Sequence, residues 1–170
     1  MHPVEVKRRL DGLICLVDTR EQNTIRAKRR LESINLPIER VALPFGDYSS
    51  RCGALDLRDS VAIERKMDLD EIAHCYCQDR KRFEREFERA RKSGAKVYLL
   101  VENASWEKAY SGVYRSQMRP ESLVASMTAW LARYRCQLIF CKEETSGKLI
   151  HDILYREMKE RLEVIPDESP

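Results

Sequence analysis

A glutamate and a lysine two residues apart, Glu64 and Lys66, stand near the end of an apolar run at residues 61–66. If this run is a β-strand, alternate side chains point to opposite faces, so Glu64 and Lys66 share one face and Arg65 lies on the other. A carboxylate and an ammonium placed together in this way form either a surface ion pair or half of a metal-dependent phosphodiesterase site.

Three aspartates lie where a folded chain could bring them to the same place. Asp18 ends the first aliphatic run, and Asp70 falls in the first turn of the helix predicted after the strand. Asp47 precedes Glu64 by seventeen residues. Mg²⁺ and Mn²⁺ prefer carboxylate oxygens over histidine or thiolate. A metal held by Asp47 and Glu64 would polarise a phosphate oxygen and acidify a bound water, while Lys66 would orient that water or stabilise the developing charge.

Each aspartate also has a purely structural interpretation. Asp18 would bond a neighbouring helix N-terminus, and Asp47 would serve the turn after a glycine. Asp70 would complement the dipole of its helix. Acid-rich strand ends are nevertheless costly unless the acids are paired or bound to metal, and the set as a whole therefore favours a metal site.

The elements that must position these side chains follow from hydrophobic periodicity. Single strands are predicted at 13–18, 96–102 and 137–142, and two or three antiparallel strands are predicted within 37–66. Five helices are predicted. The first is 23–35, with Asn23 or Thr24 as cap, and the second starts at Leu69 after a capping box formed by Asp68 and Glu71. The third has an apolar stripe at Phe83, Phe87 and Ala90 and is ended by Gly94, and the last two are 120–135 and 146–162. This order predicts an α/β fold in which a central mixed β-sheet is flanked by helices on both faces.

The length of 170 residues predicts one domain, which we place at 13–163, after an N-terminal extension at 1–12 and before a polar tail at 164–170. Apolar residues make up 43% of the chain and charged residues 35%, and no apolar run approaches the ~18 residues of a membrane span. The N-terminus has no apolar core of signal-peptide length, so we expect a cytoplasmic protein.

Basic residues are concentrated in the helix predicted at 80–92, which holds seven basic and three acidic side chains. This pattern is typical of a solvated helix face with ion pairs such as Arg80–Glu84 and Glu88–Lys92, or of a surface that binds phosphate. Both interpretations stay open on the charge pattern alone; the second would place contacts to a phosphate backbone on this helix. The side chains expected to make them are Arg82, Arg85, Arg89 and Lys92.

Three short motifs resemble those of the XPF-type structure-specific endonuclease family, which is marked by GD, a spacer and then E-R-K-x-x-x-D. They are VDTRE (17–21), GDY (46–48) and IERKMDLD (63–70). The resemblance covers roughly residues 13–142 and is far more specific than an isolated acidic pair. It implies a restriction-endonuclease-like fold, with 13–163 as a nuclease domain that uses Mg²⁺ or Mn²⁺ to hydrolyse phosphodiester bonds in branched DNA such as 3′ flaps, forks or junctions.

The resemblance also implies a role for each matching residue. Asp47 and Glu64 would be metal ligands, Asp18 and Asp70 would complete an acidic ring, and Lys66 would be the catalytic lysine. The supporting residues would be Arg20, Glu21, Arg65 and Arg80. From the strand alternation we expect Arg65 to form a structural ion pair rather than to take part in the chemistry.

One departure from the family concerns DNA recognition. Family members usually add a tandem helix-hairpin-helix domain, and the six glycines of this chain include no G-x-G hairpin. A partner protein, a second subunit or the surface of the nuclease domain would then recognise DNA structure. Two alternatives stay open: a non-catalytic DNA-binding or scaffold subunit, and a restriction or resolvase-type enzyme of the same fold. The intact acids and lysine favour the enzyme, which would be nucleoid-associated, or nuclear in a eukaryote.

The closing helix carries more apolar positions than one core-facing stripe requires. They are Leu149, Ile150, Ile153, Leu154, Met158 and Leu162. Together with the resemblance this predicts a homodimer with a two-fold interface. The alternative is that both sides of the stripe pack within one chain.

Overall fold

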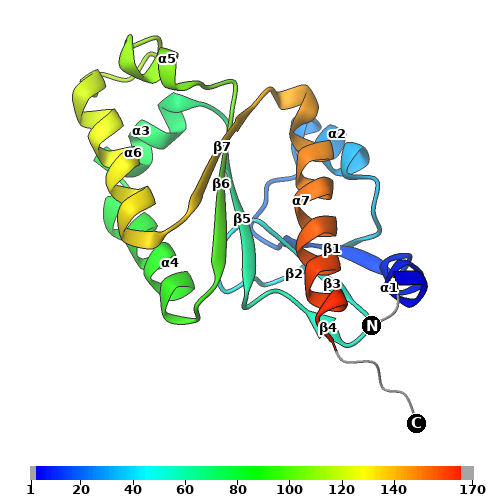
Figure 1. The fold of residues 1–170 in the computed structure, drawn as a ribbon. Coiled ribbons are helices and arrows are strands. Elements are labelled where there is room, and N and C mark those ends of the chain that lie inside the picture. The colour runs from blue at the N-terminus through cyan, green and yellow to red at the C-terminus, as the bar shows by residue number, and fades with distance from the viewer. Residues whose placement is uncertain (1–2, 166–170) are drawn as a thin grey trace.

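The structure is a computed structural model that describes residues 3–165. It is a mixed seven-stranded sheet with helices on both sides (Figure 1). The strands are β1 (Leu13–Asp18), β2 (Ile38–Val41), β3 (Tyr48–Cys52), β4 (Leu55–Asp56), β5 (Val61–Lys66), β6 (Lys96–Glu102) and β7 (Gln137–Cys141). The helices are α1 (Pro3–Leu10), α2 (Ile25–Ile34), α3 (Leu69–Cys77), α4 (Arg80–Lys92), α5 (Trp106–Tyr110), α6 (Pro120–Tyr134) and α7 (Glu143–Glu163).

The strand order is β2-β1-β3-β5-β6-β7, with β4 paired to β3. Strands β5, β6 and β7 run parallel, whereas β3 is antiparallel to both β1 and β5. The prediction for residues 37–66 was wrong in one respect: β2 is parallel to β1, because helix α2 carries the chain back before β2 begins. Antiparallel pairing in this region is confined to β3, β4 and β5.

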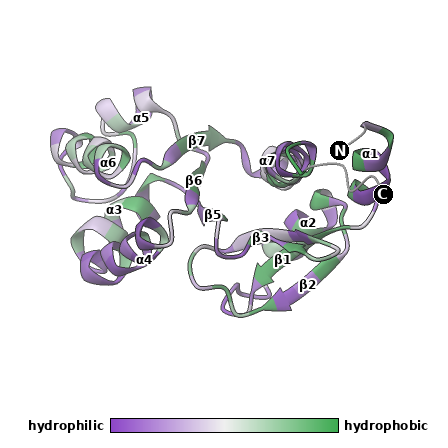
Figure 2. Cartoon of the chain, turned by 60° about the horizontal axis from the view of Figure 1, so that its bottom comes forward, coloured by the Kyte–Doolittle hydropathy of each residue, from purple (hydrophilic) through white to green (hydrophobic). Residues whose placement is uncertain are grey.

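Figure 2 shows the helices in two groups on opposite sides of the sheet. Helices α3, α4 and α6 cover one face around a buried aromatic cluster that includes Trp130, Phe83 and Phe87. Helices α2 and α7 cover the other face, where Leu100 of β6 packs with Ile150 and other aliphatic side chains. The predicted fold class is confirmed.

Helix α7 lies between the sheet and two other helices, which accounts for the width of its apolar stripe. Ile150, Ile153 and Leu154 face the sheet, while Met158 and Leu162 pack with α1. Both sides of the stripe are therefore covered within one chain, and it provides no argument for a dimer. The described part of the extension at 1–12 forms α1, whose side chains join this core, and residues 166–170 of the predicted tail lie outside the described residues.

A glycine sets the distance between α2 and α7. A Cβ at Gly147 would lie 1.8 Å from the hydroxyl of Ser33 and 2.5 Å from the carbonyl oxygen of Arg30. Only glycine lets the two helix backbones approach this closely. The contact fixes the position of Arg30, whose side chain reaches Glu102 at the end of β6. Within the described part of the chain, no helix is long and apolar enough to cross a membrane.

Candidate active site

A glycine turn places Asp47 beside the end of β5. Gly46 has a φ of +72°, and a Cβ there would lie 2.8 Å from that of Ala62, so glycine is required for the turn to pack on β5. The Asp47 N–H donates to the carbonyl oxygen of Ile63 (2.8 Å), and its Oδ2 accepts from the N–H of Arg65 (2.8 Å). These two bonds hold the Asp47 carboxylate next to β5.

Glu64 and Lys66 lie on the same face of β5, as the alternation predicts. Lys66 Nζ donates to Glu64 Oε1 at 2.5 Å, and Glu64 is only 4% exposed. Nζ also lies 5.3 Å from the centre of the Phe83 ring and 3.9 Å from Glu71. Lys66 is therefore a half-buried cation between carboxylates.

The two carboxylates of this cluster resist ionisation. Burial raises the pKa of Glu64, and the negative charge of Asp47 raises it further, to about 8. Burial likewise raises the pKa of Asp47, to about 6, although Lys66 opposes the shift. Burial acts to lower the pKa of Lys66, but Glu64 and Asp47 raise it above its usual range, so the lysine stays protonated. Two acids thus share one cation, and a second cation would relieve their repulsion.

An open polar cavity of about 420 Å³ contains these three side chains. Its walls include Arg26 on the α2 side and Arg82 with Glu86 on the α4 side. Glu86 Oε1 accepts from the N–H of Gly46 at 3.1 Å, and its charge also raises the pKa of Glu64. Sequence reasoning counted Glu86 only among the three acids of the basic helix. Its position one turn after Arg82 was the available signal, because residues four apart share a helix face.

Asp18 does not line this cavity. Its Oδ1 accepts from the N–H and Nε of Arg20 (2.8 and 2.6 Å), and its Oδ2 accepts from the N–H of Leu43 (2.8 Å). Burial acts to raise the pKa of Asp18, but these bonds lower it below its usual value. The expected place of Asp18 in an acidic ring has no support in the geometry, because three donors from its own neighbourhood occupy both oxygens.

Asp70 also lies outside the cavity. Its carboxylate accepts from the backbone N–H groups of Arg115 and Ser116, both at 2.7 Å, and from Arg115 Nε at 3.0 Å. Arg80, predicted to support the site, pairs with Glu84 at 3.1 Å and lies over the ring of Trp130. Neither Asp70 nor Arg80 reaches Glu64.

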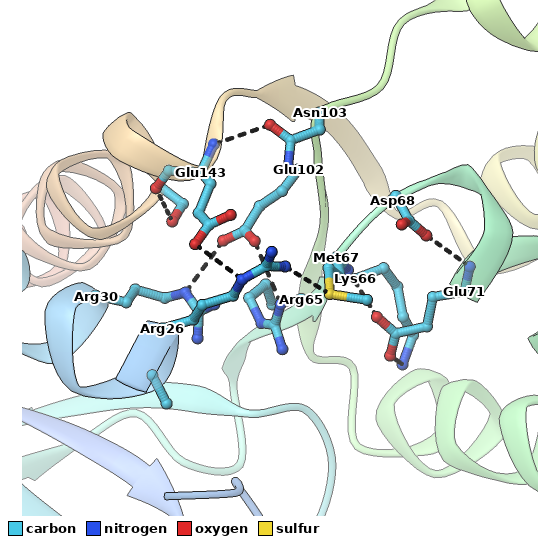
Figure 3. Close-up of polar contacts among 12 residues, drawn as sticks. Arg26, Arg30, Arg65, Lys66, Met67, Asp68, Glu71, Glu102, Asn103 and Glu143 are labelled. Carbon is cyan, nitrogen blue, oxygen red and sulfur yellow. Dashed lines mark hydrogen bonds and ion pairs between the residues drawn. The ribbon is translucent and has the colours of Figure 1, made fainter. Parts of the chain in front are cut away.

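A second charged cluster lies on the opposite face of β5 (Figure 3). Arg65 pairs with Glu102 at 3.3 Å, which confirms the expected ion pair. The buried Arg30 donates to Glu102 (3.1 Å), to Glu21 (3.0 Å) and to the hydroxyl of Tyr48 (3.2 Å). Glu21 accepts from Arg30 and from the Tyr48 hydroxyl, and its role as a brace stays a prediction. The sequence did not predict Arg30 as a partner, because nothing in the pattern of α2 marks one arginine among several as buried.

The basic residues of α4 divide into two sets. Arg82 lines the cavity, whereas Arg85, Arg89 and Lys92 line a separate open groove on the outer side of the helix. The predicted pair between Glu88 and Lys92 does not form; Glu88 pairs with Arg91 at 3.0 Å instead. The outer groove therefore retains exposed positive charge.

The cavity offers two neighbouring carboxylates as ligands for a divalent cation. Among residues 3–165, no three histidine, cysteine, aspartate or glutamate side chains converge tightly enough to hold a metal ion by themselves. The neighbouring carboxylates of Asp47 and Glu64 suit Mg²⁺ or Mn²⁺, which usually keep several waters and take one or two carboxylates plus a substrate phosphate. The raised pKa values of both acids are the observation that fits an added cation.

A family model described as the ERCC4 domain matches residues 17–153. The chain belongs to the ERCC4 domain family. This confirms the resemblance to XPF-type nucleases seen in the three motifs. No curated protein is significantly similar in sequence to the chain.

Two solved structures resemble this ERCC4 domain. XPF from Aeropyrum pernix is 23% identical, with a TM-score of 0.64 over 89% of this chain and 68% of the XPF chain. XPF from Aeropyrum pernix in complex with DNA is 24% identical, with a TM-score of 0.62 over 87% of this chain and 66% of the other. The likeness establishes a restriction-endonuclease-like fold, and the chain spans about two thirds of the length of these XPF chains.

Proposed function

We propose that this ERCC4 domain is a metal-dependent endonuclease that hydrolyses phosphodiester bonds in branched DNA. The observation that carries the proposal is the convergence of Asp47, Glu64 and Lys66 in one polar cavity at the end of β5. Family membership supports the same reaction, and Asp18 and Asp70 are not needed for it.

The residues of the cavity divide the chemistry among them. Asp47 and Glu64 would hold Mg²⁺ or Mn²⁺, which when bound polarises a phosphate oxygen and acidifies water. Lys66 presents its protonated Nζ to the same phosphate, where it stabilises charge that develops in the transition state. Arg26 and Arg82, on opposite walls, would bind the neighbouring phosphates and so orient the strand.

The exposed cations of α4 would extend this contact along the DNA backbone. The XPF from Aeropyrum pernix that was solved in complex with DNA is consistent with DNA as the ligand. Replacing Arg85, Arg89 and Lys92 with glutamate should weaken binding to every DNA roughly tenfold or more and flatten its salt dependence, because each phosphate contact releases counterions. A matched control reverses three exposed cations near α1 and on α7: Lys7, Arg8 and Arg156. Equal effects in the two variants would place the DNA path elsewhere.

The homodimer is proposed on the family resemblance alone, since α7 offers no free apolar stripe. A partner protein that recognises branched DNA stands as the alternative source of specificity. Light scattering at micromolar concentration separates the two, because a dimer has twice the 20.0 kDa mass of the chain.

The proposed activity is tested by incubating the purified protein with end-labelled flap, fork, junction and plain duplex DNA, with and without Mg²⁺ or Mn²⁺. We expect cleavage near the branch only when a metal is present. A protein that binds these substrates but cuts none under either metal would be a scaffold subunit. Cleavage of plain duplex at fixed sequences would identify a restriction-type enzyme instead.

A further inference from the structure

The segment between β6 and α6 exposes an unusual combination of side chains. Tyr110 is 66% exposed and Val113 is 60% exposed, and both belong to the few large apolar residues that the described chain leaves in solvent. Three exposed cations accompany them: Lys108, Arg115 and Arg119. The side chains of Arg115 and Arg119 are 85% and 81% exposed. Neither the chemistry in the cavity nor the contacts of the core use this group.

These side chains project from a backbone that is held in place. The hydroxyl of Tyr114 donates to the carbonyl oxygen of Met118 (2.8 Å), and Lys108 Nζ donates to that of Asn103 (2.9 Å). Gly112 turns the chain with a φ of +67°. The strongest attachment is Asp70, with its three hydrogen bonds to Arg115 and Ser116. An ordered support of this kind lowers the entropic cost of binding a ligand.

The segment lies at the same edge of the sheet as the candidate active site. Strands β5 and β6 are parallel, β5 ends at Lys66, and α5 follows β6 directly (Figure 1). Asp70, in the first turn of α3 just after β5, joins this segment to the strand that carries Glu64 and Lys66. Ligands of sheets with parallel strands bind at this edge.

We propose that residues 105–119 bind the unpaired strand of a branched DNA substrate. Tyr110 and Val113 would contact exposed bases, while the cations Lys108, Arg115 and Arg119 would bind phosphates. Exposed aromatic faces next to cations are the features by which proteins bind single strands, whereas a duplex offers this surface no base face. The positive charge favours nucleic acid over an apolar protein partner: Glu107 is the one acid within the segment, and Glu121 just beyond it is paired with Arg119.

The assignment gives Asp70 a positioning role in place of metal binding, and it rests on the proposed nuclease function. It deepens that function by naming the surface through which a fork or flap would differ from plain duplex. It needs no second domain to make this distinction.

The test measures binding to a labelled fork and to a duplex of equal length, in EDTA so that nothing is cut. Replacing Tyr110 and Val113 with serine should weaken fork binding about 10-fold and leave duplex binding unchanged, since loss of one stacked base has an effect of this size. Val164→Ser, at a 79% exposed site, is the matched apolar control. Asp70→Asn should reduce fork preference in the same direction.

A second measurement locates the contact directly. A photoreactive 5-bromodeoxyuridine in the unpaired arm should cross-link to a peptide within 105–119, and one in the duplex arm should not. Unchanged fork preference in the serine variant, or cross-links confined to other segments, would overturn the inference while leaving wild-type cleavage intact. If the serine variant has a lower molecular mass in solution than the wild type and an unchanged fork preference, Tyr110 and Val113 instead belong to an interface between two copies of the chain. A wild-type protein that binds no DNA would remove the proposed function as well.

Discussion

The two faces of β5 carry charged clusters of opposite character. On one face, Asp47 and Glu64 lie beside the half-buried cation Lys66 and border the open cavity. On the other face, Arg65 joins a network in which Glu21 and Glu102 pair with arginines and Arg30 also bonds Tyr48. The edge of this network, at Glu21, Arg30 and Arg65, reaches the same cavity. Neighbouring residues of one strand thus enter either an unbalanced group or a balanced one.

The difference in charge balance distinguishes a candidate reactive site from a structural network. In the balanced network each carboxylate accepts from an arginine, so the buried charges compensate one another. In the unbalanced cluster burial raises the pKa of both acids, and the negative charge of Asp47 raises that of Glu64 further. Such a surplus of acid is unfavourable in the isolated protein and becomes favourable when a cation arrives. A strained, incompletely compensated cluster beside a cavity is typical of a functional site.

The largest expected effect comes from removing a member of the unbalanced cluster. Lys66→Ala and Asp47→Asn should each reduce cleavage of flap DNA by several orders of magnitude, because each removes charge from the reacting phosphate or its metal. DNA binding should persist, since α4 is unchanged. Single-turnover kinetics with circular dichroism as a fold control provide the measurement, and near wild-type rates in both variants would move the site elsewhere.

Breaking the balanced network should affect folding more than chemistry. Arg30→Met leaves Glu21 and Glu102 without their shared partner in a buried position, and we expect a loss of ~3–5 kcal/mol of unfolding free energy. Urea denaturation measures it. Adding Glu102→Gln to this variant should recover part of the loss, since it removes one uncompensated charge. If Glu102→Gln instead lowers the unfolding free energy further, by as much as it does alone, Arg30 and Glu102 do not interact.

The pH dependence of stability should report the surplus acid. In the folded, metal-free protein the pKa of Glu64 is raised, so the folded state holds its proton when the unfolded chain has released it. Stability therefore falls as pH rises from about 4.5 toward 8. Glu64→Gln removes this penalty and should raise the melting temperature at pH 8 in EDTA by ~4–8 °C, corresponding to ~2 kcal/mol, with little change at pH 4.5. A constant difference at both pH values would contradict the assigned cause.

Replacing one member of an exposed ion pair should have the smallest effect on both stability and cleavage. Arg91 and Glu88 lie on the outer surface of α4, with side chains 55% and 36% exposed. Arg91→Gln should change the unfolding free energy by less than ~0.5 kcal/mol and the cleavage rate by no more than a few-fold. A loss comparable to that of Arg30→Met would mean that burial does not distinguish the networks.

Short-range patterns predict much of this architecture. The alternation of β5 separates Glu64 and Lys66 from Arg65, and Thr24 caps α2 through the N–H of Ala27, because both features depend on residues close in sequence. The direction of β2 was not predictable in this way, because it depends on where α2 returns the chain.

Long-range contacts decide the part of the site that the sequence did not predict. Asp18 and Asp70 have the residue type of metal ligands, yet other partners occupy them: Arg20 and Leu43 for the first and the 115–116 backbone for the second. The breadth of the α7 stripe likewise suggested a dimer, because α1 was not predicted as a helix that covers it. For Asp70 and the α7 stripe the deciding partner lies far away in sequence, whereas for Asp18 a local partner, Arg20, acts together with the distant Leu43.

The return path of α7 has a practical consequence for handling the protein. Because α7 starts at the edge of the sheet where β5 ends and runs back to pack its last turns against α1, the described chain begins and ends toward the opposite edge of the sheet (Figure 1). An affinity tag, a fluorophore or a surface tether joined at either end would leave the cavity facing solution. The domain is therefore suited to immobilisation for single-molecule measurements on long DNA.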